Sequence, residues 1–127
     1  MTNKIPMTNV QKRSREDFDL CERTAKFGEA VIAFAKRVPM NPISAPPISQ
    51  VVRSATSIGA NYCEADEAES RKEFRYRIAV CKREARETKH HIRMLVAAEP
   101  TLRDGARVLW QEAKELTLIF AAILRPK

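Results

Sequence analysis

Apolar positions recur along this chain in steps of three and four residues, in four separate stretches. Such spacing keeps one face of an α-helix turned toward a core, whereas a half-buried strand alternates at every second residue. The first two stripes are Leu20, Thr24, Phe27, Val31, Phe34 and Val38, then Ile48, Val51, Ala55, Ile58, Tyr62 and Ala65. The third and fourth are Phe74, Ile78, Cys81, Ala85, Thr88, Ile92 and Leu95, then Leu102, Ala106, Leu109, Ala113, Leu116, Phe120 and Ile123.

Residues that start and stop helices lie between these stripes. Residues 1–14 are polar and lack the periodicity, so we expect a mobile tail and a first helix that begins between Ser14 and Asp17. Four prolines between residues 39 and 47 predict a loop, followed by a second helix with proline in its first turn. Ser70 and Glu73 have the spacing of a capping box, which predicts the start of the third helix.

Four stripes with short connections predict an all-α fold, an antiparallel up-down-up-down four-helix bundle. Only three glycines occur among 127 residues, which also favours helix. The length suits a single domain, which we expect to span residues 15–127 after the N-terminal tail.

The end of the fourth helix has more apolar residues than one core-facing stripe requires. A helix that is apolar on every side is usually covered on every side. One interpretation is a thick core or a packed N-terminal tail, and the other is burial between subunits. We favour an oligomer interface formed by the residues that the stripe leaves over, namely Trp110, Leu118, Ile119 and Leu124.

Positive charge is concentrated in one segment. The chain has a formal net charge of +7, and the segment from residue 71 to residue 93, with nine Lys or Arg and three Glu, accounts for +6. A row of cations along this helix could neutralise successive phosphates of a nucleic acid with little base specificity. The alternative is a solvated face whose charge is partly paired with glutamates. The candidate residues are Arg71, Lys72, Arg75, Lys82, Arg86, Lys89 and Arg93.

Aromatic residues that could stack on bases are not interleaved with these cations, apart from Tyr76. We therefore do not predict a base-stacking platform from the sequence.

Polar residues on the second and third helices also lie near the core. We expect Arg53 and Glu84 to form a structural pair that sets the register of these two helices.

Catalytic and metal-binding patterns are largely missing from the sequence. The three cysteines are widely spaced and include no Cys-x-x-Cys pair, so we expect neither a disulfide scaffold nor a zinc site. Glu87 and His90 have the Glu-x-x-His spacing of a di-metal bundle, but both lie outside the core stripe. We expect no enzyme activity, no metal and no cofactor.

No apolar run is long enough to span a bilayer, so we expect a cytoplasmic protein without a membrane partner.

Several motifs resemble one protein family. The run Gln50-x-x-Arg53-Ser-Ala-x-Ser-Ile-Gly-Ala-Asn61-Tyr-x-Glu-Ala65 and the later Ser70-Arg-Lys-Glu-Phe74 are similar to four-helix-bundle proteins encoded in intervening sequences of 23S rRNA. The segment Lys82-Arg-Glu-Ala-Arg-Glu-Thr88, followed by Ile92-Arg-x-Leu95, resembles one branch of that family. Ala65 and Cys81-Lys82 stand where many members have Gly and Gly-Ser.

The resemblance implies a homopentamer in which five bundles surround a central channel. It also implies kinship with the accessory protein of diversity-generating retroelements, a basic pentamer that binds nucleic acid and a reverse transcriptase. We therefore expect a self-assembling protein that binds RNA or DNA, with a reverse transcriptase as a possible further partner. The alternative is a protein-interaction scaffold that makes no contact with nucleic acid.

Overall fold

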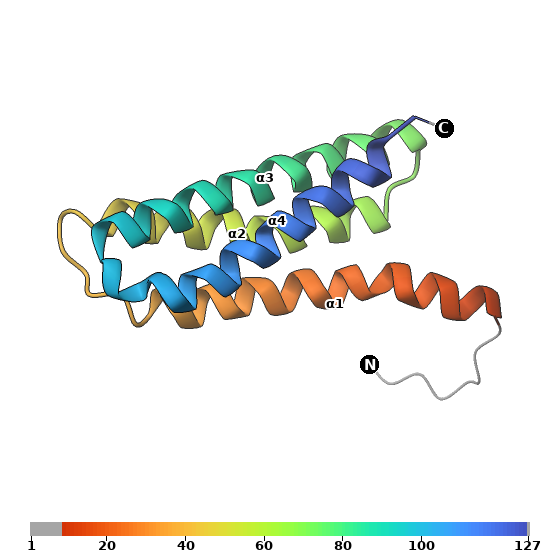
Figure 1. Ribbon diagram of the computed structural model, residues 1–127. Helices are drawn as coiled ribbons and strands as arrows, with labels where there is room; N and C mark the ends of the chain where they lie inside the picture. Colours follow the sequence, from red (N-terminus) through yellow and green to blue (C-terminus); the bar gives the residue numbers. More distant parts are fainter. Residues whose placement is uncertain (1–8, 127) are drawn as a thin grey trace.

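The chain folds into four long α-helices (Figure 1). The computed structural model describes the backbone of residues 9–126 and the side chains of residues 20–126. The helices are α1 (Asn9–Ala35), α2 (Ala45–Asp66), α3 (Arg71–Ala98) and α4 (Arg103–Leu124), and a 3₁₀ turn, η1 (Pro100–Leu102), precedes α4. The described residues contain no strand, as the all-α prediction expects.

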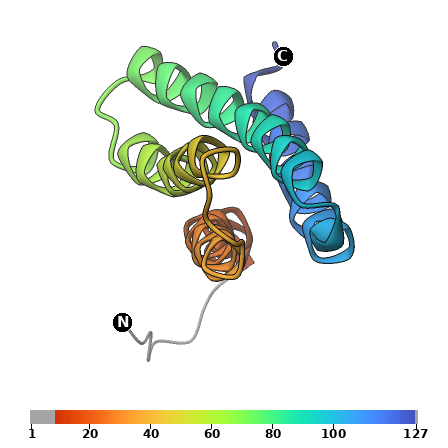
Figure 2. The same cartoon turned by 90° about the vertical axis from the view of Figure 1, so that its left-hand side faces the viewer.

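Successive helices run in opposite directions and pack side by side around a common core (Figures 1 and 2). The predicted stripes account for most of this core. Every member of the first two stripes is buried, and the third and fourth stripes are buried apart from three partly exposed positions at their ends. These three are Phe74, Leu102 and Ile123.

The first helix is longer than the sequence predicts. It begins at Asn9 rather than between Ser14 and Asp17. After Pro6 there is no glycine or proline before residue 14, so nothing local stops the helix from extending upstream. The first eight residues of the expected tail lie outside the described part of the chain.

Helix starts follow the predicted signals. Ser70 Oγ accepts a hydrogen bond of 3.0 Å from the backbone N–H of Glu73, which satisfies one of the free amides at the start of α3. Two prolines occupy the first turn of α2, where the missing N–H costs nothing. Within the described residues, no helix is long and apolar enough to span a membrane.

The fourth helix is inclined across the bundle. Its N-terminal end lies beside the end of α1, and its C-terminal end lies beside the start of α3 (Figure 1). The Arg75 guanidinium on α3 donates a 2.8 Å hydrogen bond to the backbone carbonyl of Leu124, one of the last free carbonyls of α4. This contact fixes the antiparallel register of α3 and α4.

The three cysteines differ in their surroundings. Cys81 is fully buried on the core stripe, whereas Cys63 is exposed and Cys21 is half-buried. Burial raises the pKa of the Cys81 thiol to about 12. A buried thiol that stays protonated at neutral pH behaves as a small hydrophobic side chain rather than a nucleophile.

Candidate nucleic-acid interface

Four of the predicted cations on α3 lie along the side of that helix that faces α4. Each comes one position after a residue of the core stripe, so the four occupy one edge of the buried face. The four are Lys82, Arg86, Lys89 and Arg93.

A matching row lies on α4, and its cations were not among the residues predicted from the sequence. Arg103, Arg107, Trp110 and Lys114 each follow a residue of the fourth core stripe by one position. Because α3 and α4 are antiparallel, the edge that follows the core on one helix meets the same edge of the other. The Arg75 side chain and the Leu124 carbonyl, which form a hydrogen bond, belong to residues one position after a stripe residue, in agreement with this pairing.

The two rows meet along one line of the surface, which we call the basic seam. Lys89 Nζ of α3 lies 5.5 Å from the centroid of the Trp110 ring on α4. A hollow of about 230 Å³ lies beside Trp110 and is bordered by cations of both helices. The basic seam comprises Lys82, Arg86, Lys89, Arg93, Arg103, Arg107 and Lys114.

The cations of the basic seam form no ion pair with a described carboxylate. Within the described part of the chain, the ion pairs involve other cations, Arg23, Lys26, Arg53 and Arg83, and none joins a seam residue to Asp or Glu. Glu84 and Glu87 on α3, which could have neutralised the seam, face α2 instead. Seven like charges that form no close ion pair among the described residues create a positive potential that attracts polyanions.

The other predicted cations lie at the far end of α3. Arg71 and Lys72 are exposed in the first turn, and Arg75 is partly buried against the end of α4. A second hollow there, of about 520 Å³, also involves Arg125. The structure thus divides the predicted row of seven into four seam residues and three residues near the C-terminal end of α4.

The four residues predicted as an oligomer interface differ in their exposure and surroundings. Trp110 is on the α3 side of α4 and lies near two lysines, Lys89 and Lys114. Ile119 and Leu124 are partly buried against the core of the same chain. Leu118, by contrast, remains 59% exposed.

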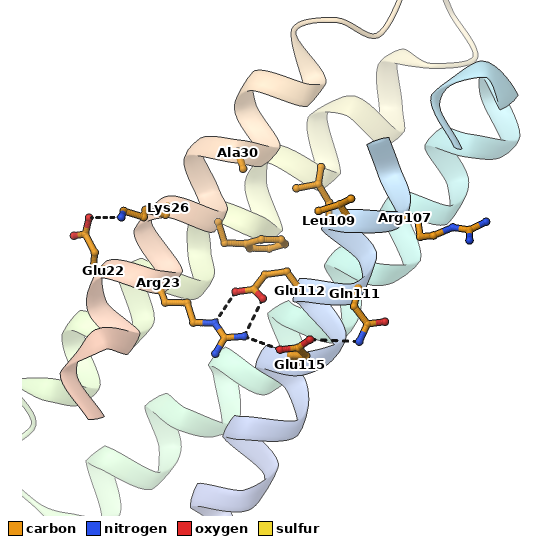
Figure 3. A pocket seen from close by; sticks show the side chains of 11 residues that line it. Glu22, Arg23, Lys26, Ala30, Arg107, Leu109, Gln111, Glu112 and Glu115 are labelled. Carbon is orange, nitrogen blue, oxygen red and sulfur yellow. Dashed lines mark hydrogen bonds and ion pairs between the residues drawn. The ribbon is translucent and has the colours of Figure 1, made fainter. Parts of the chain in front are cut away.

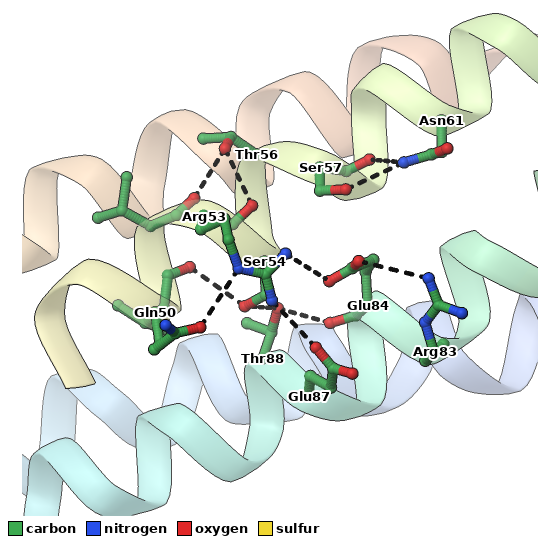
Figure 4. A network of polar contacts seen from close by, with 12 residues as sticks. Gln50, Arg53, Ser54, Thr56, Ser57, Asn61, Arg83, Glu84, Glu87 and Thr88 are labelled. Carbon is green, nitrogen blue, oxygen red and sulfur yellow. Dashed lines mark hydrogen bonds and ion pairs between the residues drawn. The ribbon is translucent and has the colours of Figure 1, made fainter. Parts of the chain in front are cut away.

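Arg53 and Glu84 lie together between α2 and α3 (Figure 4). Arg53 Nη1 is 3.4 Å from Glu84 Oε1, and the same guanidinium is 3.1 Å from Glu87 Oε1. Nearby, the buried Thr88 hydroxyl donates a 2.8 Å hydrogen bond to the Ser54 hydroxyl across the two helices. This network consists of structural contacts that hold α2 and α3 in register.

An open groove of about 990 Å³ lies between α1 and α4 (Figure 3). Arg23 of α1 spans it and donates hydrogen bonds of 2.6 and 2.9 Å to Glu112 and of 3.0 Å to Glu115. The hydrogen bonds to Glu112 are the largest cause that raises the pKa of Arg23. The groove contains both signs of charge, so it has no preference for anions.

No cluster of metal ligands forms within the described residues. His90 and His91 contact one another edge to face, with ring centroids 5.5 Å apart. Partial burial, followed by the neighbouring His90, lowers the pKa of His91. Glu87, the other member of the Glu-x-x-His pattern, pairs with Arg53 instead.

Residues 16–122 match the family described as 23S rRNA-intervening sequence protein, and this range is most of the chain. The chain belongs to this family. The match confirms the family resemblance that the α2 and α3 motifs carry. No curated protein matches the chain.

A solved structure has the same fold as this 23S rRNA-intervening sequence family member. It is a protein of unknown function from the S23 ribosomal protein family of Bacteroides thetaiotaomicron VPI-5482. The superposition has a TM-score of 0.75 at 23% sequence identity and covers 84% of this chain and 99% of the other. At this identity, the similarity establishes the fold.

Proposed function

We propose that this family member is a non-enzymatic, self-assembling cytoplasmic protein that binds RNA or DNA through the basic seam. The observation that carries the proposal is the row of seven cations from two helices that has no acidic partner among the described residues. Lys and Arg in such a row release counterions when they contact phosphates, which drives binding without sequence specificity. The family name, which refers to an intervening sequence of 23S rRNA, is consistent with a nucleic-acid context.

Charge reversal of three exposed seam residues tests this proposal. We expect the triple variant Arg86→Glu, Arg93→Glu and Arg107→Glu to lose about 100-fold in affinity for RNA at about 50 mM salt. The dependence of log affinity on log salt should also become shallower, by about 0.7 per lost phosphate contact on a single strand. Fluorescence anisotropy of a labelled RNA at about 50 and about 200 mM salt measures both quantities.

The matched control reverses three exposed cations on and just after α1: Lys26→Glu, Lys36→Glu and Arg37→Glu. It changes the net charge equally but leaves the basic seam intact, so its affinity should fall by less than about threefold. Equal losses in the two variants would show that only net charge matters.

If the wild-type protein binds neither RNA nor DNA, the proposal is wrong and the scaffold alternative replaces it. The exposed side chains of Met40 and Ile43 between α1 and α2 would then be its candidate contact.

Self-assembly is the second part of the proposal, and the outer face of α4 supports it. Leu118 is an apolar side chain that the single chain leaves largely in water, and such residues are common at interfaces between subunits. The family resemblance implies a pentameric ring. Its implied kinship with the retroelement accessory protein makes a reverse transcriptase a candidate partner.

We expect Leu118→Asp to dissociate the assembly, because a carboxylate buried between subunits loses its hydration without a partner. Light scattering should show a multiple of 14.5 kDa for the wild type and 14.5 kDa for the variant. Ala33→Asp, at an exposed position on α1, should keep the wild-type mass. A wild-type mass of 14.5 kDa would refute self-assembly but would leave nucleic-acid binding untouched.

A further inference from the structure

One aromatic ring, that of Trp110, lies among the cations of the basic seam. Trp110 is the only tryptophan of the chain, and it is 36% exposed. Tryptophan is the largest apolar side chain, and about a third of this one remains open to solvent beside cations, where it can still stack against a ligand. The sequence pattern did not reveal this arrangement, because Trp110 and Lys89 are on different helices.

The hollow beside the ring has an apolar floor and a cationic rim. Ile92 and Val96 of α3 and Ala106 of α4 line it, together with Trp110. Arg93, Arg103 and Arg107 complete the lining, which contains no acidic residue. Its volume of about 230 Å³ is below the usual range for a whole small-molecule ligand, so it suits one flat ring.

Two ammonium groups lie near the Trp110 ring, which nevertheless remains partly exposed to solvent. Lys89 Nζ and Lys114 Nζ are 5.5 and 5.8 Å from the ring centroid, close to the outer limit of about 6 Å for a cation–π contact. An exposed contact of this kind is weaker than base stacking on an aromatic side chain. An entering base can therefore displace an ammonium group, which then pairs with the phosphate that accompanies the base.

We propose that the hollow at Trp110 is a subsite for an unpaired nucleobase, so that the basic seam prefers single-stranded RNA or DNA to duplex. The inference deepens the proposed function and rests on it. The apolar floor and the indole ring take the flat base, and the surrounding arginines and lysines take its flanking phosphates. In a duplex the faces of the bases are already stacked, so the duplex meets only the cations of the seam.

Fluorescence of Trp110 gives a direct test, since no other tryptophan contributes. The probes are single-stranded RNA and DNA of about 12 nucleotides, the corresponding duplexes, and a DNA strand of equal length without bases. We expect both single strands to quench the emission. The duplexes and the strand without bases should bind through their phosphates but leave the emission nearly unchanged.

Variants separate stacking from charge. Trp110→Leu should weaken single-strand binding about tenfold, measured by anisotropy of labelled strands, and should leave duplex binding unchanged. Unchanged duplex binding also shows that this variant is folded. Trp110→Phe should recover part of the loss. Tyr76→Leu, at an exposed aromatic on α3 outside the seam, is the matched control and should bind like the wild type.

Three results would overturn the inference, and they differ in what they leave standing. Equal quenching by single strands and duplexes, or wild-type single-strand affinity in Trp110→Leu, would exclude base stacking but keep electrostatic binding. Quenching by the strand without bases would assign the effect to phosphates alone. Absence of binding by every probe would remove the proposed function as well.

Discussion

Phe120→Ala is expected to lower the free energy of unfolding by about 4 kcal/mol, because removal of a large buried side chain combines lost transfer free energy with a residual cavity. Phe120 is the largest fully buried side chain of the chain's described part, with 0% exposure. Its ring contacts that of Tyr62 on α2, with centroids 6.2 Å apart. The side chain thus links the C-terminal part of α4 to α2.

Urea unfolding followed by circular dichroism measures this loss, at a fixed protein concentration because assembly would add to the apparent stability. Ile43→Ala is the control, since it also removes an apolar side chain but at a position exposed between α1 and α2. Its stability should stay within about 0.5 kcal/mol of the wild type. A Phe120→Ala variant as stable as this control would contradict the position of α4 on the bundle.

The effect of a substitution at Gly28 on the free energy of unfolding is expected to depend on the size of the new side chain: a small one should stabilise the protein and a large one should destabilise it. A Cβ atom there would lie 3.6 Å from the Thr56 Cα and 3.7 Å from the Ala55 carbonyl oxygen of α2, which are ordinary contacts. Gly28→Ala should therefore stabilise the protein by up to about 1 kcal/mol, the difference in helix propensity. Gly28→Leu should destabilise it by about 3 kcal/mol, because its further atoms meet backbone that cannot rotate away.

The same urea titration measures the free energy of unfolding of both Gly28 variants. Ala25→Leu, on the exposed side of α1, is the control for adding a leucine side chain to this helix. That control should differ little from the wild type. If Gly28→Leu were as stable as Gly28→Ala, α1 and α2 could not pack as closely as the structure shows. The contrast between the two substitutions therefore tests the α1–α2 interface independently of the Phe120 result.

Much of the fold could be predicted, because burial along a helix is a local property of spacing. Residues three and four apart lie on one face whatever the helix packs against, so the stripes from Leu20 to Ile123 identified the core before any neighbour was known. Helix starts are equally local, as the hydrogen bond between Ser70 and Glu73 shows. The start of α1 was missed because the segment before Ser14 lacks both a stripe and a helix breaker.

The candidate site was only half predictable. The row on α3 was visible as a periodic pattern, and Lys82, Arg86, Lys89 and Arg93 do lie on one edge of that helix. Arg103, Arg107 and Lys114 were missed although the same one-position offset from the core occurs on α4. A search for basic residues that follow core positions on both helices would have found them.

The sequence by itself determined the four helices, their buried faces and the excess of positive charge on α3, since all three depend on residues close together in the chain. The tertiary structure alone decided which edges meet. Packing placed Glu84 beside Arg53 of α2, and it placed Trp110 of α4 beside Lys89. Periodicity identifies the face that a helix buries, but the neighbour on each side of that face is set by how the helices pack.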